Sequence, residues 1–536
     1  MVNSRSFCGS PPSVKLKLAL KAIEYWEETL TVKKPGDGKQ LANRYCESDQ
    51  YYTLSENKSI FCYQSSCKSV VMCGGVKIPD EYIRECYEVK NNLLHRTYIN
   101  GSGIPAAGYI LFVDSINTPI CYGSTAAYAS SCLMDGETDR PILGFVNVCP
   151  GKMKVDYPED RNSLGVFLHE IGHALGFASH NFPFMRYPDG TPRTPRDDKG
   201  KPKYRDEYGN YIPSNETIKK ITRAWRSTEG LFTKDFYSFV TPSILTAART
   251  HFNCSQLDGA DLENRYQTGP IESHWEGRAY SGEVMASRVS VDSSVSLVTL
   301  GFFEDSGWYT VNKSKAMRWE YGRKLGCDFC MKSCFDYAEI QRQYGRKFTP
   351  FCDTVNEARC RDAFSYGVCS IFRYEIPVPI KDRFFLKAPF DTQYGPEYFG
   401  GEDPFSDYCP TMAYVKGLGC EYSATSFCTH EENEKLSSKG VNRYYQTYGP
   451  EGICVEHRSV WTYTEKHTYT LETFLKGSCH KYTCYKDGTL GLYFKNSTVN
   501  CTRKDQLVHF NVTDGTSRLT GEILCPNINR FCKGKT

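Results

Sequence analysis

Long hydrophobic runs are missing from this chain of 536 residues. No stretch of about 18 consecutive apolar residues occurs, so we expect no membrane-spanning helix. A surplus of charge is missing as well, because 65 lysine and arginine residues are balanced by 62 aspartate and glutamate residues, for a formal net charge of +3. No long basic run with interleaved aromatic residues is present, and we therefore expect no nucleic-acid partner.

The two ends of the sequence lack targeting signals. The first residues, MVNSRSFCGSPPS, contain no apolar core of a secretory signal peptide. The last residues, RFCKGKT, contain no hydrophobic tail of the kind that precedes a lipid anchor. We therefore expect either a mature form whose leader has been removed or numbering that starts at an internal residue.

Paired zinc-knuckle spacing is also missing, although cysteine is abundant. The 25 cysteines run from Cys8 to Cys532, and Cys327-Asp-Phe-Cys330 has no second matching half. So many thiols are difficult to maintain in a reducing cytosol, which predicts a disulfide framework and a secreted or cell-surface location. The odd count leaves at least one cysteine without an internal partner; Cys8 is a candidate, and its alternative is an ordinary disulfide to the body.

Sequons for N-glycosylation favour the same compartment and predict a glycoprotein, although a single sequon also arises by chance. The eight sequons begin at Asn57, Asn100, Asn215, Asn253, Asn312, Asn496, Asn500 and Asn511.

The length predicts two or three packed units, because one hydrophobic core rarely extends over so many residues. Good helix formers with apolar residues at spacings of three and four predict a helix over 14–29. The β-rich apolar runs 109–113 and 142–148 predict buried strands. Residues 187–211 are polar and rich in Pro, Gly, Asp and Lys, which predicts a surface insertion. We find no internal repeat.

The cysteines become denser from Cys327 onward, where 15 of the 25 lie and where short runs with Tyr and Thr replace helical periodicity. The whole pattern predicts an α+β protein. Its predicted parts are a flexible tail at 1–13, an N-terminal α/β subdomain at 14–177, a central subdomain at 178–310 and a disulfide-rich, mainly β C-terminal domain at 311–536.

The segment LGVFLHEIGHALGF at 164–177 is the most informative part of the chain. Its apolar residues repeat at intervals of four, three and four, which predicts an amphipathic helix that packs against a sheet and ends at Gly176. The residues of this stripe are Leu164, Leu168, Ile171 and Leu175.

His169 and His173 share a different face of this helix, one turn apart, so both imidazoles can bind one metal ion. Glu170 lies beside them, where a carboxylate can take a proton from metal-bound water without being a ligand. Zinc suits this pattern because it accepts neutral imidazole nitrogen, keeps a position open for water and lowers the pKa of that water to about 7. The alternative is a chance HExxH on a core helix.

The third ligand is not fixed by local spacing. The extended pattern HExxHxxGxxH requires histidine where this chain has Ser179, and His180 comes one position later. A shifted turn could bring in His180, and a histidine from far along the chain is the alternative. A glutamate ligand should follow His173 by roughly 18 to 20 residues, as in thermolysin or the aminopeptidases. The nearest downstream glutamate is Glu207, so those families fit poorly.

Three motifs resemble the leishmanolysin family of metzincin peptidases: HEIGHALGF at 169–177, ESHWE at 272–276 and GEVMA at 282–286. The resemblance continues to the last cysteines and so covers nearly the whole chain. It implies that a distant histidine, His274, is the third zinc ligand and that Met285 lies in a turn beneath the metal, where it can also be simple core filling. It further implies a metzincin-like catalytic body, with a mixed sheet, an active-site helix and an inserted central domain. The interval between the helix and the third histidine is longer than the usual insertion of that family.

The resemblance implies a secreted or cell-surface zinc metalloendopeptidase that hydrolyses peptide bonds of proteins and holds one zinc ion. In this hypothesis the substrate carbonyl is polarised by zinc, while Glu170 deprotonates the water and later protonates the leaving amine. One alternative is a surface adhesion or coat glycoprotein that retains a protease fold. Another is a zinc hydrolase that acts on something other than peptides, because fold alone does not fix the substrate. The sequence indicates neither a cleavage preference nor an oligomeric state.

Overall fold

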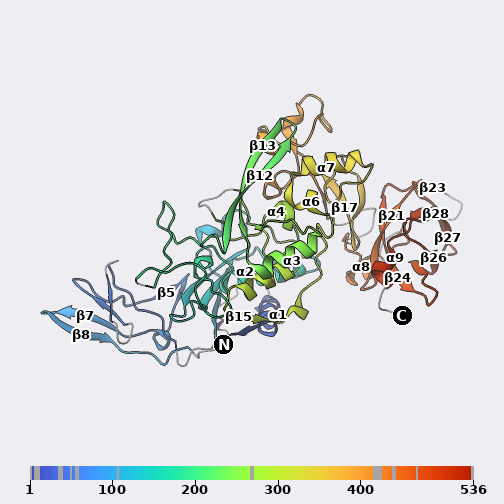
Figure 1. Cartoon of the computed structure of the whole chain (residues 1–536). Coiled ribbons are helices and arrows are strands. Elements are labelled where there is room, and N and C mark those ends of the chain that lie inside the picture. Colours follow the sequence, from blue (N-terminus) through green and yellow to red (C-terminus); the bar gives the residue numbers. More distant parts are fainter. Residues whose placement is uncertain are drawn as a thin grey trace. The chain divides into compact units, whose positions relative to one another are not determined.

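The structure is a computed structural model, and its chain divides into two compact units. Unit 1 comprises residues 1–222 and 235–319, and unit 2 comprises residues 223–234 and 320–536. Figure 1 labels the helices and strands along the chain. Cys8 lies outside the described residues. These are residues 3–4, 12–33, 40–48, 51–54, 59–104, 108–198, 200–265, 271–414, 425–437, 442–465 and 469–532.

A mixed four-stranded sheet forms the centre of unit 1. Its inner strands are almost continuously apolar and buried, as expected for strands covered on both faces. The edge strand β10 is half-buried and runs antiparallel to its neighbour, whereas the other pairs are parallel. In spatial order the strands are β1 (Asn3–Ser4), β9 (Ile110–Asp114), β11 (Pro141–Val148) and β10 (Ala127–Met134).

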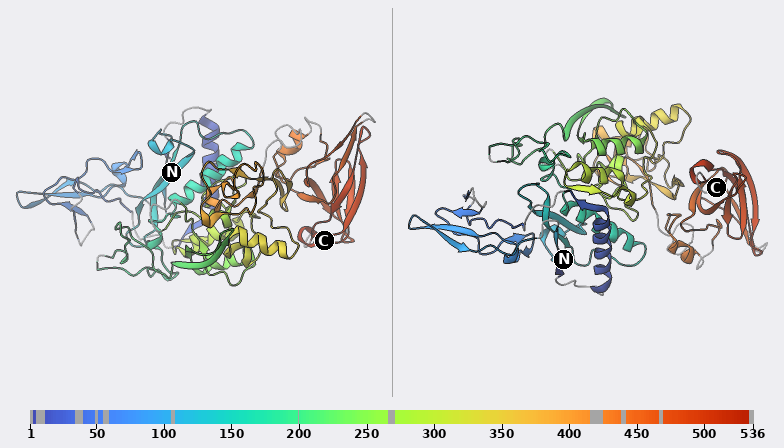
Figure 2. Two further views of the ribbon diagram at one scale, coloured as in Figure 1. Left: turned by 90° about the horizontal axis from the view of Figure 1, so that it is seen from above. Right: turned by 60° about the horizontal axis from the view of Figure 1, so that its bottom comes forward.

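Two helices pack together in unit 1. Helix α2 (Glu159–Ala174) contacts β10 and β11, and α1 (Pro12–Thr29) lies beside α2 (Figure 2). The indole Nε1 of Trp26 in α1 donates a hydrogen bond to the carbonyl oxygen of Leu168 in α2, at 3.1 Å. The predicted helix at 14–29 and the predicted strands around 109–113 and 142–148 are therefore confirmed, with bounds that shift by one or two residues.

Smaller elements complete unit 1. Residues between α1 and β9 form a four-stranded sheet, β3 (Tyr52–Thr53), β4 (Ile60–Cys62), β7 (Cys86–Lys90) and β8 (Leu93–Tyr98), and the hairpin β5 (Met72–Cys73) and β6 (Val76–Lys77). The segment after α2 supplies α3 (Pro242–Phe252), β14 (Ala260–Asp261), α4 (Gly277–Tyr280), α5 (Leu297–Asp305) and β15 (Tyr309–Val311), which pairs with β2 (Leu30–Val32). Short 3-10 helices are η1 (Asp80–Tyr82), η2 (Pro119–Cys121), η3 (Phe182–Phe184) and η4 (Lys313–Lys315).

Strand β12 (Ile218–Ser227) begins in unit 1 and strand β13 (Gly230–Phe239) ends in unit 1, whereas residues 223–234 between those points belong to unit 2. Unit 2 continues with helices α6 (Cys327–Met331) and α7 (Cys334–Gln343) and with short strands and 3-10 helices. These elements are β16 (Ala358–Asp362), β17 (Ser365–Ser370), β18 (Phe372–Arg373), η5 (Ile380–Asp382), η6 (Pro396–Tyr398), β19 (Phe399–Gly400), η7 (Pro404–Ser406), β20 (Thr411–Ala413) and α8 (Glu432–Ser437).

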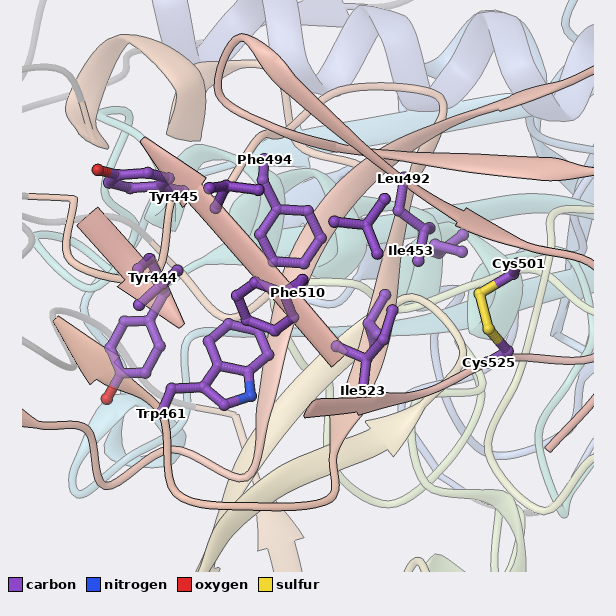
Figure 3. Packing of buried hydrophobic residues seen from close by; sticks show 14 of the residues in the cluster. Tyr444, Tyr445, Ile453, Trp461, Leu492, Phe494, Cys501, Phe510, Ile523 and Cys525 are labelled. Carbon is purple, nitrogen blue, oxygen red and sulfur yellow. A yellow bond between two sulfur atoms is a disulfide. The ribbon is translucent and has the colours of Figure 1, made fainter. Parts of the chain in front are cut away.

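An antiparallel sheet dominates the C-terminal part of unit 2. Alternate residues of its strands point inward, and large side chains such as Trp461, Phe494 and Phe510 pack into one apolar core (Figure 3). The strands are β21 (Gly452–His457), β22 (Thr462–Glu465), β23 (Tyr469–Glu472), β24 (Gly477–Cys484), β25 (Leu490–Phe494), β26 (Ser497–Cys501), β27 (Leu507–Thr513) and β28 (Ser517–Leu524), and helix α9 (Ile528–Cys532) follows them.

Ten disulfide bonds are defined within the two units, which confirms the predicted disulfide framework. Unit 1 holds Cys46–Cys62, Cys67–Cys86, Cys73–Cys132 and Cys121–Cys149. Unit 2 holds Cys334–Cys409, Cys352–Cys369, Cys360–Cys454, Cys428–Cys479, Cys484–Cys532 and Cys501–Cys525. This mixed helix-and-sheet, disulfide-rich fold is consistent with the predicted α+β class. In the described part of the chain, no helix is long and apolar enough to cross a bilayer.

Candidate metal centre

Helix α2 carries the HExxH motif in the buried interior of unit 1. From Gly165 onward each of its residues is buried. The helix ends at Ala174, earlier than the predicted end at Gly176. Gly176 has φ +130°, and a Cβ there would lie 2.7 Å from the ring of Trp308, so this sharp exit from the helix requires glycine.

Three imidazoles meet at one point in unit 1. The Nε2 atoms of His169 and His173 are 3.0 Å apart, and the Nε2 atoms of His173 and His274 are 3.2 Å apart. The ring of His173 is nearly perpendicular to the other two, at 89° and 84°. The structure thus brings together the two helical histidines and the distant histidine that the resemblance implied.

Backbone carbonyls fix the tautomers of the two helical histidines. Nδ1 of His169 lies 2.6 Å from the carbonyl oxygen of Val284, and Nδ1 of His173 lies 2.6 Å from that of Phe177. Because a carbonyl oxygen only accepts, each Nδ1 carries the hydrogen and each Nε2 presents a lone pair. These converging lone pairs fit a cation: two nitrogen ligands of tetrahedral zinc lie about 3.3 Å apart when the Zn–N bonds are about 2.0–2.1 Å.

Burial keeps these imidazoles neutral, which is the form that binds a metal. It lowers the pKa of His169 to about 4 and that of His274 to about 3. Burial and the neighbouring imidazoles also hold the pKa of His173 well below its usual value. Glu170 is 7% exposed, and burial raises the pKa of its carboxyl group to about 8 in the absence of a cation. A nearby cation would favour the ionised form again.

Main-chain hydrogen bonds place His274 opposite α2. Its carbonyl oxygen accepts from the amide of Glu263 at 2.9 Å, and the amide of Trp275 donates to the carbonyl oxygen of Met285 at 2.9 Å. The hydroxyl of Ser273 accepts from the amide of Ser179 at 2.9 Å, which ties this segment to the residues that follow the helix.

Met285 is fully buried and lies directly against α2. A Cβ added to Gly172 would lie 2.7 Å from its sulfur atom, so glycine at this position lets the helix approach the methionine. The residue before it, Val284, supplies the carbonyl that binds His169. Met285 therefore packs against the helix that carries His169 and His173.

The other candidates lie outside this cluster. His180 is exposed, and its Nε2 lies 3.0 Å from the hydroxyl of Ser131 on β10. Glu207 is exposed within the insertion. Sequence reasoning missed the carbonyls of Val284 and Phe177, because a backbone acceptor leaves no signal in residue identity.

The insertion after α2 contains a repeat that we did not find in the sequence. Three short turns follow one another, and in each an arginine is followed four residues later by a glycine with positive φ. The pattern is too short and degenerate for recognition by residue type alone. The turns are closed by bridges that join Arg186 to Pro192, Arg196 to Pro202 and Arg205 to Tyr211.

Comparison with known proteins finds one family over most of the chain. The sequence profile of the family described as leishmanolysin matches residues 74–194 and 213–536, which leaves out 195–212 of the insertion. The chain is similar to the leishmanolysin-like peptidase of Drosophila melanogaster, with 32% identity over 96% of this chain and 76% of the relative. The leishmanolysin-like peptidase of Caenorhabditis elegans is 30% identical over 97% of this chain and 80% of that relative. A leishmanolysin homolog of Crithidia fasciculata is 24% identical over 86% of this chain and 58% of the homolog.

Proposed function

Because this chain belongs to the leishmanolysin family of peptidases, we propose that it is a secreted or cell-surface zinc metalloendopeptidase that cuts peptide bonds of proteins. The observation that carries the proposal is the convergence of three Nε2 atoms, two of them with tautomers set by backbone carbonyls. His169, His173 and His274 would hold the zinc ion. Bound there, zinc would supply a Lewis acid that polarises the scissile carbonyl and acidifies the attacking water.

Glu170 is the proton carrier in this proposal. It lies on the same helix as two of the proposed ligands, and its burial raises its pKa, so it can take a proton from water and return it to the leaving amine. Its carboxylate would be the general base in the first step and the general acid in the second. Met285 would act only as packing beneath the site.

Ten disulfides and several sequons support an oxidising location for this activity. An adhesion or coat protein that keeps a peptidase fold would share these features. A degenerate motif would favour that reading, yet the histidines and the glutamate expected for chemistry are present together. We therefore favour catalysis, with adhesion as a second activity that needs its own assay.

The decisive experiment replaces Glu170 with Gln, which removes the base but keeps the shape of the side chain. We expect E170Q to bind zinc stoichiometrically, as measured by metal analysis, and to lose peptidase activity on casein by about 10²–10⁴-fold. A matched control on the same helix is E159Q in the first turn, which should keep both properties. Full activity in E170Q would refute the role of Glu170, and stoichiometric zinc without hydrolysis in the wild-type protein would favour the adhesion reading.

A further inference from the structure

A buried carboxylate lies one residue before the peptide group that binds His169. Glu283 is 0% exposed and belongs to the loop between α4 and α5. We propose that Glu283 is a positioning residue that orients and polarises His169 through the peptide group between Val284 and Met285. This inference rests on the proposed function, since it concerns the basicity of a proposed metal ligand.

The geometry of that peptide group is the main argument. Its N–H, from Met285, donates to Oε2 of Glu283 at 2.7 Å. Its C=O, from Val284, accepts from Nδ1 of His169 at 2.6 Å. In a trans peptide the N–H and the C=O point in opposite directions, so fixing the N–H also aims the carbonyl. The carboxylate, the peptide and the imidazole therefore form one chain of hydrogen bonds.

Such a chain transmits charge toward the metal site. Hydrogen bonds in series polarise one another, most strongly where water is excluded. Burial raises the pKa of the Glu283 carboxyl group to about 7. In its ionised form this group makes the Val284 carbonyl a better acceptor, and this increases electron density on Nε2 of His169. Metal-binding histidines often contact a carboxylate directly and gain affinity from it. Here a peptide group is interposed between the two.

Further donors hold the carboxylate itself in place. Oε1 of Glu283 accepts from the amide of Ser296 at 3.1 Å and from its hydroxyl at 2.8 Å. The side chain of Thr299 also bonds to Glu283. Ser296 caps the N-terminus of α5, where the helix dipole favours a negative charge. An ionised carboxylate can accept all of these bonds, because it has two acceptor oxygens and no donor.

The same network reaches the third histidine. The indole Nε1 of Trp275, the residue after His274, donates to the hydroxyl of Thr299 at 2.9 Å. The amide of Trp275 donates to the carbonyl oxygen of Met285 at 2.9 Å. Glu283 and Thr299 thus connect two features to the N-terminus of one helix: the carbonyl that binds His169 and the segment that supplies His274.

The test exploits the difference between a carboxylate and an amide. Glutamine has the shape of glutamate but only one acceptor oxygen, so in E283Q an NH2 group faces the N–H of either Met285 or Ser296. A matched control is D305N, because Asp305 is 6% exposed and caps α3 with bonds to the amides of Ser243 and Ile244, at 2.8 and 3.1 Å. Both substitutions neutralise a buried carboxylate at a helix N-terminus in unit 1.

Zinc affinity, measured by competition with a chromogenic chelator, is the first readout. We expect E283Q to weaken zinc binding by about 10- to 100-fold, the range for an outer partner of a metal-binding histidine, with D305N at the wild-type value. Cobalt(II) absorption is the second readout, and E283Q should shift the visible bands while D305N does not. Wild-type zinc affinity in E283Q, or an equal loss in D305N, would overturn the inference.

Two further outcomes separate this inference from the proposed function. If E283Q does not fold, T299V takes its place, because it removes one hydroxyl group at nearly constant volume. We expect T299V to weaken zinc binding as well. An unchanged zinc affinity in T299V would count against the positioning role of Glu283. Another outcome is a wild-type protein that binds zinc but shows no peptidase activity, together with weaker zinc binding in E283Q. In that case the inference about Glu283 holds and the proposed function fails. Zinc binding that survives H169A unchanged would overturn both.

Discussion

Gly172 sets the distance between helix α2 and the turn that contains Met285. A methyl group there would meet the sulfur of Met285 at 2.7 Å and the edge of Trp26 at 3.7 Å. Alanine is the better helix former by about 1 kcal/mol, but overpacking of a dense core usually costs about 1–3 kcal/mol. The contact with Met285 therefore decides the sign of the effect.

We predict that G172A lowers the thermal unfolding temperature and weakens zinc binding, because the helix must move away from the turn that holds His169. Calorimetry and chelator competition measure the two effects. In an M285A background the methyl group has space, so the effect of G172A should largely vanish in a double-mutant cycle. An equal effect in both backgrounds would show that Met285 is not the cause.

The sequence offers both His180 and His274 as the third metal ligand, and single substitutions distinguish these two alternatives. We predict that H274A weakens zinc binding by more than about 100-fold, because it removes a proposed direct ligand. The loss of a residue that only contacts a ligand typically costs about 10- to 100-fold. H180A should leave zinc affinity unchanged, because this side chain is exposed and faces Ser131. Metal titration of the two variants decides the matter, and a loss confined to H180A would reverse the assignment.

Helix α2 shows how much of the site could be predicted from the sequence. The four-residue spacing of His169 and His173 fixes their common face on any helix, so local pattern sufficed for this pair. His274 lies 101 residues beyond His173, and only the family resemblance indicated it. Glu283 could not be predicted, because it acts through a peptide group that any residue could provide. The three turns of the insertion were missed for a similar reason, since backbone geometry rather than residue type defines them.

Strands β21 and β24 hold a pair of buried histidines, His457 and His480. Both Nε2 atoms contact the hydroxyl of Ser478, at 2.7 and 2.8 Å, and each Nδ1 contacts a backbone carbonyl. Burial lowers the pKa of His480 to about 3 and also lowers that of His457. The two side chains are therefore neutral in the folded sheet at neutral pH.

This pair predicts acid-sensitive stability of the C-terminal sheet. The unfolded chain takes up protons near pH 6.5, whereas the folded sheet does not until about pH 3. The stabilisation is complete above pH 6.5 and falls as the pH drops from 6.5 toward 3. Urea unfolding followed by Trp fluorescence at several pH values measures it. H480F should flatten the profile, because it removes one titrating group; a profile as steep as that of the wild type would argue against this origin.

The two units differ in what stabilises them. Unit 1 carries four of the defined disulfides and all three clustered histidines, and unit 2 carries six disulfides around its sheets. The residues that define the candidate metal centre therefore all belong to unit 1.

Removal of the metal should consequently act on one unit only. A ligand that binds only the folded state stabilises it by about 2.7 kcal/mol when its free concentration is 100 times its dissociation constant. Because His169, His173 and His274 all belong to unit 1, we predict two calorimetric transitions, of which only one moves to lower temperature when EDTA removes zinc. Addition of zinc should restore that transition, and H173A should lack the response altogether. A single transition that shifts as a whole would show that the units unfold together. Limited proteolysis can assign each transition to a unit, and a shift of the transition of unit 2 would place the metal elsewhere.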